Sequence, residues 1–170
     1  MPGTDYLNRG PGAKVISRSV PFDEIVSPEV LTLQAYVDRT RGRRPFLSKA
    51  DLDPAQIKPL LPLLALMEIS TAPLRVHYRL FGTSLVALYG ELTGTYLDER
   101  TDNPQLRDEA MKNYRRLVVE KTPIYGITEL EIGTNRRRTF EWAFFPLSSD
   151  GSTVSHALYI EQRSKEKPRF

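Results

Sequence analysis

Two clusters of arginine are the residues of this sequence best suited to bind an anion. The clusters are Arg39, Arg41, Arg43 and Arg44, followed later by Arg136, Arg137 and Arg138. Guanidinium groups bind phosphates and carboxylates through paired hydrogen bonds. If both clusters lie on one surface, they could hold a nucleotide messenger or nucleic acid. No interleaved aromatic pattern and no helix-turn-helix accompanies them, which argues against nucleic acid.

Both clusters also have a structural explanation. The first follows a predicted helix, where cations complement the negative end of the helix dipole, and the second lies at a predicted hairpin turn. Acidic residues number 21 against 24 basic ones, with a net charge of +3, and this mixture is typical of a solvated surface. We therefore treat the anion binder as the alternative function.

Aromatic residues from separate parts of the chain could line a pocket for a small ligand. They are Tyr78, Tyr89, Tyr114, Trp142 and Phe144, with His156 as a polar anchor if its strand face points inward. Ligand pockets are mostly apolar, with a few polar groups that fix orientation. An ordinary aromatic core would use the same residues, and it is the simpler interpretation.

The groups that catalysis requires do not come together in this sequence. The chain has no cysteine and two histidines, which removes thiol catalysis, disulfides and thiolate metal sites. The carboxylate pairs Asp51 with Asp53 and Glu129 with Glu131 fit a helix start and a polar strand face. No histidine pair has metal-ligand spacing. We expect no catalytic residue, no metal site and no enzyme activity.

The elements that would position these residues follow from capping signals and hydrophobic periodicity. Ser27 and Pro28 begin a helix that should run to about Thr40, with Gly42 just past its end, and Asp53 should cap a second, short helix. Further helices are expected over residues 83–89 and from residue 104 up to Pro123. Alternating or continuous apolar runs predict strands over residues 63–70, 75–81, 124–132, 137–147 and 153–162.

This order predicts an α+β domain with a five-stranded antiparallel sheet. The helices inserted after the first hairpin would cover one face of the sheet, around a single concave core. A chain of 170 residues with 40 % hydrophobic residues suits one such domain. Residues 1–20 show no sustained periodicity, so we expect residues 1–26 to be a mobile tail.

Three local segments, together with this order of elements, are similar to a known family. The segments are YVDRTRGRRPFLSKADLDP from Tyr36 to Pro54, the Leu61-Pro62 pair, and YRLFGTSLVALYGELTGTYLDE from Tyr78 to Glu99. Over residues 28–162 the chain resembles a bacterial group of single-domain PAS-like proteins. The resemblance implies flanking helices over residues 27–62, a PAS core over residues 63–163 and a C-terminal tail over residues 164–170. It also implies a sensory or protein-interaction module that signals through a separate partner.

The resemblance does not identify a cofactor. PAS domains that carry haem usually bind it through a histidine on a helix, whereas His156 is expected on a strand, so haem is not favoured. Covalent flavin photochemistry needs a cysteine, and this chain has none. The cofactor is therefore left unassigned.

The expected partner is a signalling protein, with a small apolar or aromatic ligand second. The predicted helix over residues 28–40 has a broad apolar stripe that could form a homodimer; the stripe consists of Val30, Leu31, Leu33, Tyr36 and Val37. No stretch approaches the roughly 18 apolar residues of a membrane span, and no secretory signal begins the chain. We therefore expect a cytoplasmic protein.

Overall fold

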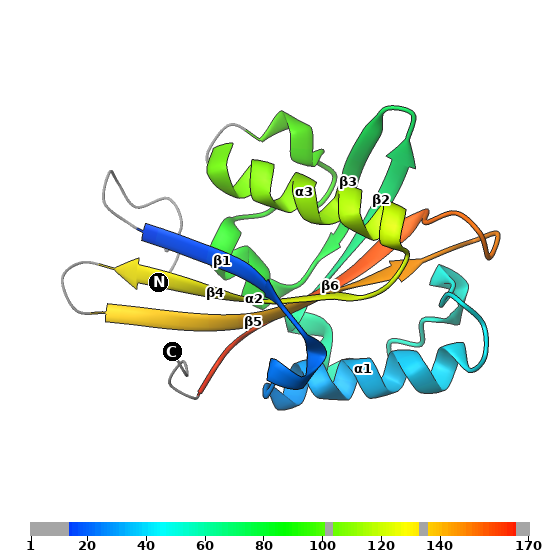
Figure 1. Ribbon diagram of the computed structural model, residues 1–170, viewed down its shortest axis with the longest axis horizontal. Coiled ribbons are helices and arrows are strands. Elements are labelled where there is room, and N and C mark those ends of the chain that lie inside the picture. Colours follow the sequence, from blue (N-terminus) through cyan, green and yellow to red (C-terminus); the bar gives the residue numbers. More distant parts are fainter. Residues whose placement is uncertain (1–13, 101–103, 133–135, 166–170) are drawn as a thin grey trace.

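A six-stranded antiparallel sheet forms the centre of the molecule, with helices on both of its faces (Figure 1). The structure is a computed structural model, and it describes residues 14–100, 104–132 and 136–165. The strands are β1 (Lys14–Val20), β2 (Leu64–Thr71), β3 (Leu74–Phe81), β4 (Ile124–Ile132), β5 (Arg136–Leu147) and β6 (His156–Arg163). Their order across the sheet is β1-β4-β5-β6-β2-β3. The predicted α+β class is confirmed, but the sheet has six strands rather than the five expected, because β1 adds a strand at its edge.

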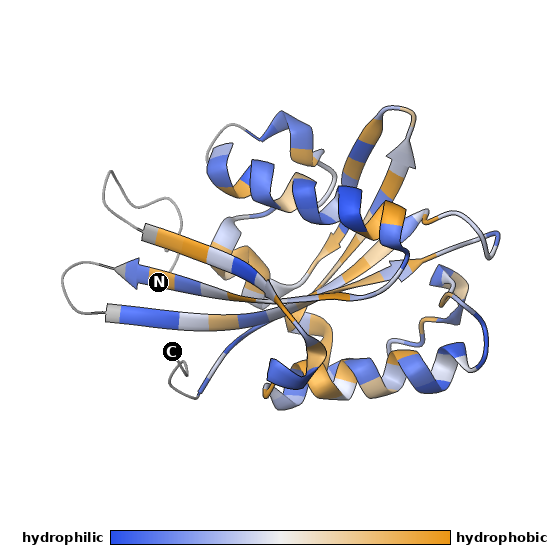
Figure 2. Cartoon of the chain, viewed as in Figure 1, coloured by the Kyte–Doolittle hydropathy of each residue, from blue (hydrophilic) through white to orange (hydrophobic). Residues whose placement is uncertain are grey.

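Within the residues that the structure describes, three α-helices and four short 3-10 helices connect the strands. The α-helices are α1 (Pro28–Arg41), α2 (Thr83–Tyr89) and α3 (Pro104–Glu120). The 3-10 helices are η1 (Phe22–Glu24), η2 (Lys49–Asp51), η3 (Lys58–Leu63) and η4 (Leu97–Glu99). Figure 2 shows hydrophilic and hydrophobic bands along α3, as expected for a helix with only one buried side.

The ends of α1 follow the signals in the sequence. The Ser27 hydroxyl accepts a hydrogen bond from the Val30 backbone N–H at 3.5 Å, and Pro28 occupies the first turn. Gly42 ends the helix with φ of 61°, a conformation that favours glycine. At Asp53 the expected helix is replaced by a turn, in which the Asp53 carboxylate accepts bonds from the Ala55 backbone and the Gln56 side chain.

The prediction of a mobile tail over residues 1–26 is wrong for residues 14–20, which form β1. This strand pairs with β4 from Lys14 opposite Glu131 to Val20 opposite Tyr125. It is an edge strand, and in its sequence, KVISRSV, polar residues interrupt the apolar ones, so periodicity gives little signal. Residues 1–13 and 166–170, which the predicted tails also include, lie outside the described residues.

The sheet separates two hydrophobic cores, rather than covering the single concave core that the sequence predicted. Helices α2 and α3 cover one face of the sheet, where Leu85 and Leu117 pack with Trp142. Helix α1 covers the opposite face, where Leu33 packs in the same cluster as Phe145. The strands β5 and β6 are therefore buried on both sides, and successive residues along them face different cores.

Helix α1 is fixed to the sheet by the buried carboxylate of Glu141. This side chain, in a residue only 2 % exposed, accepts hydrogen bonds from the backbone N–H groups of Val26 at 3.2 Å and Ser27 at 2.5 Å. These groups lie at the start of α1, where free N–H groups and the helix dipole favour an anion. Strand β5 thus holds the N-terminus of α1 through one carboxylate.

Candidate functional site

A cavity of about 110 Å³ lies between the sheet and the helices α2 and α3. The sheet contributes Ser17, Ala65, Met67, Tyr78, Phe81, Thr128, Trp142, Phe144, Tyr159 and Glu161. The helices and the loops beside them contribute Tyr89, Leu92, Leu97, Arg100, Leu106, Glu109, Ala110, Asn113 and Tyr114. Its lining is mostly apolar and aromatic with a few polar groups, which is the usual composition of a small-molecule site.

All five aromatic residues proposed from the sequence as pocket residues line this cavity. Tyr78 and Tyr89 each lie near Phe81, with ring centroids 5.6 Å and 6.2 Å from that of Phe81. Tyr114, Trp142 and Tyr159 each lie near Phe144, at 5.1, 5.5 and 4.6 Å. The rings form two groups, one around each phenylalanine, that face the same space.

A buried carboxylate, that of Glu161, provides the polar anchor of the cavity. The residue is 4 % exposed. The Tyr89 hydroxyl donates to both carboxylate oxygens, at 2.8 Å and 2.7 Å, and the Tyr159 hydroxyl donates a short hydrogen bond to Oε2. Glu161 lies directly opposite Trp142 on the neighbouring strand, so the carboxylate and the indole are adjacent.

Burial dominates the ionisation of these three groups. Desolvation raises the pKa of Glu161 above its ordinary value, and the two tyrosine hydroxyl groups oppose this shift by hydrogen bonding. The pKa values of Tyr89 and Tyr159 are also raised well above the usual range, first by burial and then by the nearby carboxylate. Both tyrosines therefore keep their protons and act as donors at neutral pH.

His156, the polar anchor proposed from the sequence, does not line the cavity. Side chains alternate along β6, so Ala157, Tyr159 and Glu161 share one face while Leu158 and Ile160 pack toward α1 on the other. His156 lies on the same face of β6 as Leu158 and Ile160, which is the face away from the cavity. Its Nδ1 lies 3.0 Å from the Ser155 hydroxyl, and desolvation lowers its pKa.

The second histidine also lies away from the cavity. His77 is on β3, where its ring stacks near that of Tyr96 with centroids 4.6 Å apart. Since the chain has two histidines, no imidazole among the cavity residues is available to bind a haem iron.

A hydrogen-bonded row across β5, β4 and β1 closes another side of the cavity. The Trp142 indole N–H donates to the Thr128 hydroxyl at 2.9 Å, and the hydroxyls of Thr128 and Ser17 are 2.8 Å apart. The indole lies directly over Gly126, where a Cβ atom would be 1.9 Å from the ring. A glycine at residue 126 is therefore what allows the Trp142 ring to lie flat against β4.

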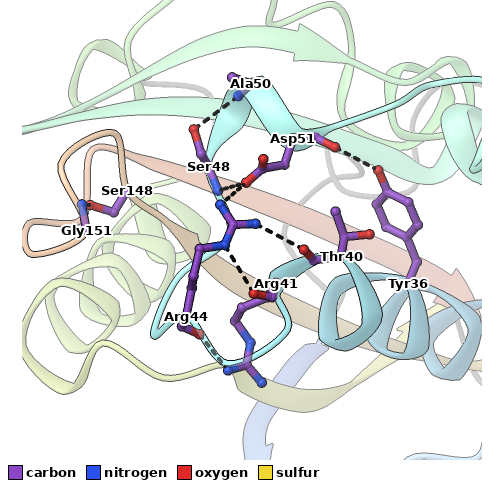
Figure 3. A network of polar contacts seen from close by, with 9 residues as sticks. All are labelled: Tyr36, Thr40, Arg41, Arg44, Ser48, Ala50, Asp51, Ser148 and Gly151. Atoms are coloured by element: carbon purple, nitrogen blue, oxygen red, sulfur yellow. Dashed lines mark hydrogen bonds and ion pairs between the residues drawn. The ribbon is translucent and has the colours of Figure 1, made fainter.

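The first arginine cluster is largely engaged within its own loop (Figure 3). The Arg44 guanidinium donates to the backbone carbonyls of Thr40 and Arg41 and forms an ion pair with Asp51 at 2.9 Å. Arg41 donates to the Arg44 carbonyl and pairs with Asp38, and Arg39 donates to Gln56. These contacts support the end of α1, in keeping with the structural explanation given above.

The two arginine clusters do not form one surface. The first spans the last turn of α1 and the residues just after it, the second begins β5, and these lie at opposite ends of the long axis of the molecule (Figure 1). In the second cluster Arg137 forms an ion pair with Glu131 at 2.9 Å. Only the backbone is described for Arg136. The anion-binding alternative required both arginine clusters to lie on one surface. Among the described residues they do not.

The carboxylates considered for catalysis have separate structural surroundings. Asp51 forms a capping box with Ser48 on η2, and the Ser48 backbone N–H lowers its pKa. Glu131 pairs with Arg137, whereas Glu129, two residues before it, does not line the cavity. Within the described ranges, no cluster of three metal-ligating side chains occurs, and no helix is long and apolar enough to cross a membrane.

Most of the apolar stripe on α1 is covered by its own sheet. Val30, Leu33, Tyr36 and Val37 are buried, and Leu31 is 37 % exposed. The width of this stripe, which suggested a second chain as its partner, is thus largely explained by packing within the domain.

Comparison with known proteins agrees with this architecture. The family model described as PAS domain matches residues 25–160. This range contains α1, the strands β2 to β5, the first five residues of β6 and every residue that lines the cavity except Ser17 and Glu161. No curated protein matches the chain. The match covers most of the sequence, and it confirms the resemblance seen in the three local segments: this chain belongs to the PAS domain family.

Proposed function

We propose that this protein is a non-enzymatic sensory module that binds a small molecule in the cavity and signals through a separate protein. The observation that carries the proposal is the buried Glu161 carboxylate, held by two tyrosine hydroxyls at the wall of a mostly apolar cavity. Burial of a charge costs free energy, and unlike Glu141, which holds the backbone at the start of α1, Glu161 is hydrogen-bonded among the described residues to tyrosine hydroxyls alone. A ligand site uses such a group to orient what it binds.

Membership of the PAS domain family supports a sensory rather than a catalytic role. The cavity residues include no cysteine, histidine or lysine, and Glu161 is bonded to phenol groups rather than to a nucleophile. The signal would pass to a signalling protein. A homodimer through α1 remains a prediction, for which Leu31 and the neighbouring Val26, 43 % exposed, are the available apolar contacts.

Native mass spectrometry of the gently purified protein tests ligand binding directly. We expect reproducible excess mass that disappears on denaturation, and the same spectrum reports the oligomeric state. Ala110→Phe would place a ring in the cavity from α3 and should abolish the excess mass. Ala35→Phe, on the exposed side of α1, is the matched control and should retain it.

The proposal is contradicted if the protein has a clean apo mass and if a small-molecule library also leaves the fluorescence of its single tryptophan unchanged. Excess mass that survives in Ala110→Phe would contradict the cavity as the site of binding.

A further inference from the structure

We propose that the ligand of this cavity is a small organic cation, whose ammonium group lies beside Glu161 and among the aromatic rings. This inference rests on the proposed function and specifies its ligand class. Three features carry it: the charge of Glu161 lacks a cationic partner, acceptor positions on its carboxylate remain open, and aromatic rings surround it.

The first feature is the unpaired charge. Among the described residues, Glu161 is hydrogen-bonded to two neutral hydroxyl groups and takes part in no ion pair. The other acid of the cavity, Glu109, is already paired with Lys112 at 3.0 Å and is partly exposed. A buried carboxylate is stabilised by an opposite charge, which here a ligand would supply.

The second feature is hydrogen-bond capacity. A carboxylate offers about four acceptor positions, and Tyr89 and Tyr159 each have one hydroxyl proton to donate. Acceptor positions therefore remain for a donor in the cavity. An ammonium group satisfies this need with charge-assisted bonds, which are stronger than those of a neutral donor.

The third feature is the aromatic surroundings. Tyr89 neighbours Phe81, Tyr159 neighbours Phe144, and Trp142 lies opposite Glu161 across the strand pair. The faces of aromatic rings attract cations, and rings arranged as a cage are a recurring means of binding ammonium groups. The same rings would also contact the hydrocarbon part of the ligand.

The volume limits the size of the cation. A cavity of about 150 Å³ is known to hold benzene, with six carbon atoms, so the smaller cavity of about 110 Å³ here suits a molecule of at most about six non-hydrogen atoms. A short alkylamine or a single-ring amine meets this limit. A polyamine chain or a porphyrin does not.

The test compares two six-membered rings of nearly equal shape, piperidine and tetrahydropyran. At pH 7.5 piperidine is protonated, whereas tetrahydropyran is neutral and has no donor. Both are titrated into the full chain, and the Trp142 indole N–H resonance reports occupancy, because the chain has one tryptophan. We expect piperidinium to bind at least about tenfold more tightly than tetrahydropyran.

The variant Glu161→Gln keeps the shape of the side chain and removes its charge. It should weaken piperidinium binding by about 10-fold to 100-fold and leave tetrahydropyran binding within about twofold. The control Glu120→Gln removes a carboxylate of α3 that is paired with Arg116 and does not line the cavity, and it should leave both affinities within about twofold. If Glu161→Gln does not fold, the ratio of the piperidinium affinity to the tetrahydropyran affinity in the unmodified chain still tests the proposal.

Equal binding of the two rings would overturn the proposal while supporting a ligand cavity. An equal loss of piperidinium binding in Glu120→Gln would also overturn it, because the loss would then follow from the net charge of the protein and not from a contact with Glu161. If neither ring binds, the cation proposal fails, and the native mass measurement judges the ligand-sensing function separately.

Discussion

Substitution of Gly126 by alanine should destabilise the protein through a clash with Trp142. The new Cβ would lie 1.9 Å from Cζ2 and 2.3 Å from Cε2 of the indole, whereas ordinary contact begins at 3.4 Å. The ring would have to move by about 1.5 Å, in an interior packed as densely as a crystal. Its movement would also break the hydrogen bond from the indole N–H to Thr128.

The expected loss is about 2 kcal/mol in the free energy of unfolding. Overpacking of a core costs about 1–3 kcal/mol, and loss of the indole hydrogen bond adds about 1 kcal/mol. Replacement of a strand glycine by alanine offsets about 0.5–1 kcal/mol of this loss, because alanine lowers the conformational entropy of the unfolded chain. A net cost of this size should clearly lower the urea concentration at the unfolding midpoint.

Urea unfolding followed by far-ultraviolet circular dichroism measures the cost, and a double-mutant cycle identifies its cause. In a Trp142→Leu background the clashing ring is gone, so Gly126→Ala should cost much less than in the unmodified chain. The reasoning is refuted if Gly126→Ala leaves the midpoint unchanged, or if its cost is the same in both backgrounds.

Two further predictions concern the buried carboxylates. Glu141→Gln should destabilise the protein by about 1–3 kcal/mol, because the Glu141 carboxylate accepts hydrogen bonds from the backbone N–H groups of Val26 and Ser27. In the same urea assay, the control Glu120→Gln changes an exposed carboxylate and should leave the unfolding midpoint unchanged. A similar loss of stability in both variants would contradict this role of Glu141. Because the pKa of Glu161 is raised in the folded state, its proton stabilises the fold below the ordinary value of 4.5, and this contribution is lost as pH rises through the folded pKa. Urea unfolding at several pH values measures this effect. As pH rises, the free energy of unfolding of the unmodified chain should fall relative to that of Glu161→Gln, by up to about 1.4 kcal/mol per pH unit. The same pH dependence in both chains would rule this out.

The sequence predicted the elements that are marked by local chemistry. Ser27, Pro28 and Gly42 bound α1 as expected, and alternation located the strands of both hairpins to within a few residues. These signals act between neighbours in the chain, so they can be read without knowing the fold. The aromatic residues that line the cavity were also named from the sequence, where an ordinary aromatic core was the simpler interpretation of the same residues.

The missed features depend on contacts between distant segments. Strand β1 exists because β4 pairs with it, which no pattern within residues 14–20 shows. Glu161 was overlooked because Leu158 and Ile160 made the other face of β6 look like the inner one. Both faces are buried, since α1 covers one and α3 the other. A signal was present in the unbroken apolar run from Ala157 to Ile160, since a continuous apolar run is typical of a strand buried on both faces.

The two covered faces of β5 make this strand a rigid link between the cavity and α1. Trp142 forms part of the cavity wall, and the preceding residue, Glu141, holds the first turn of α1 from the opposite side. A shift of the peptide between them would strain the hydrogen bond of Glu141 to Ser27 and that of Trp142 to Thr128. The cavity wall and the N-terminus of α1 therefore depend on the same stretch of backbone.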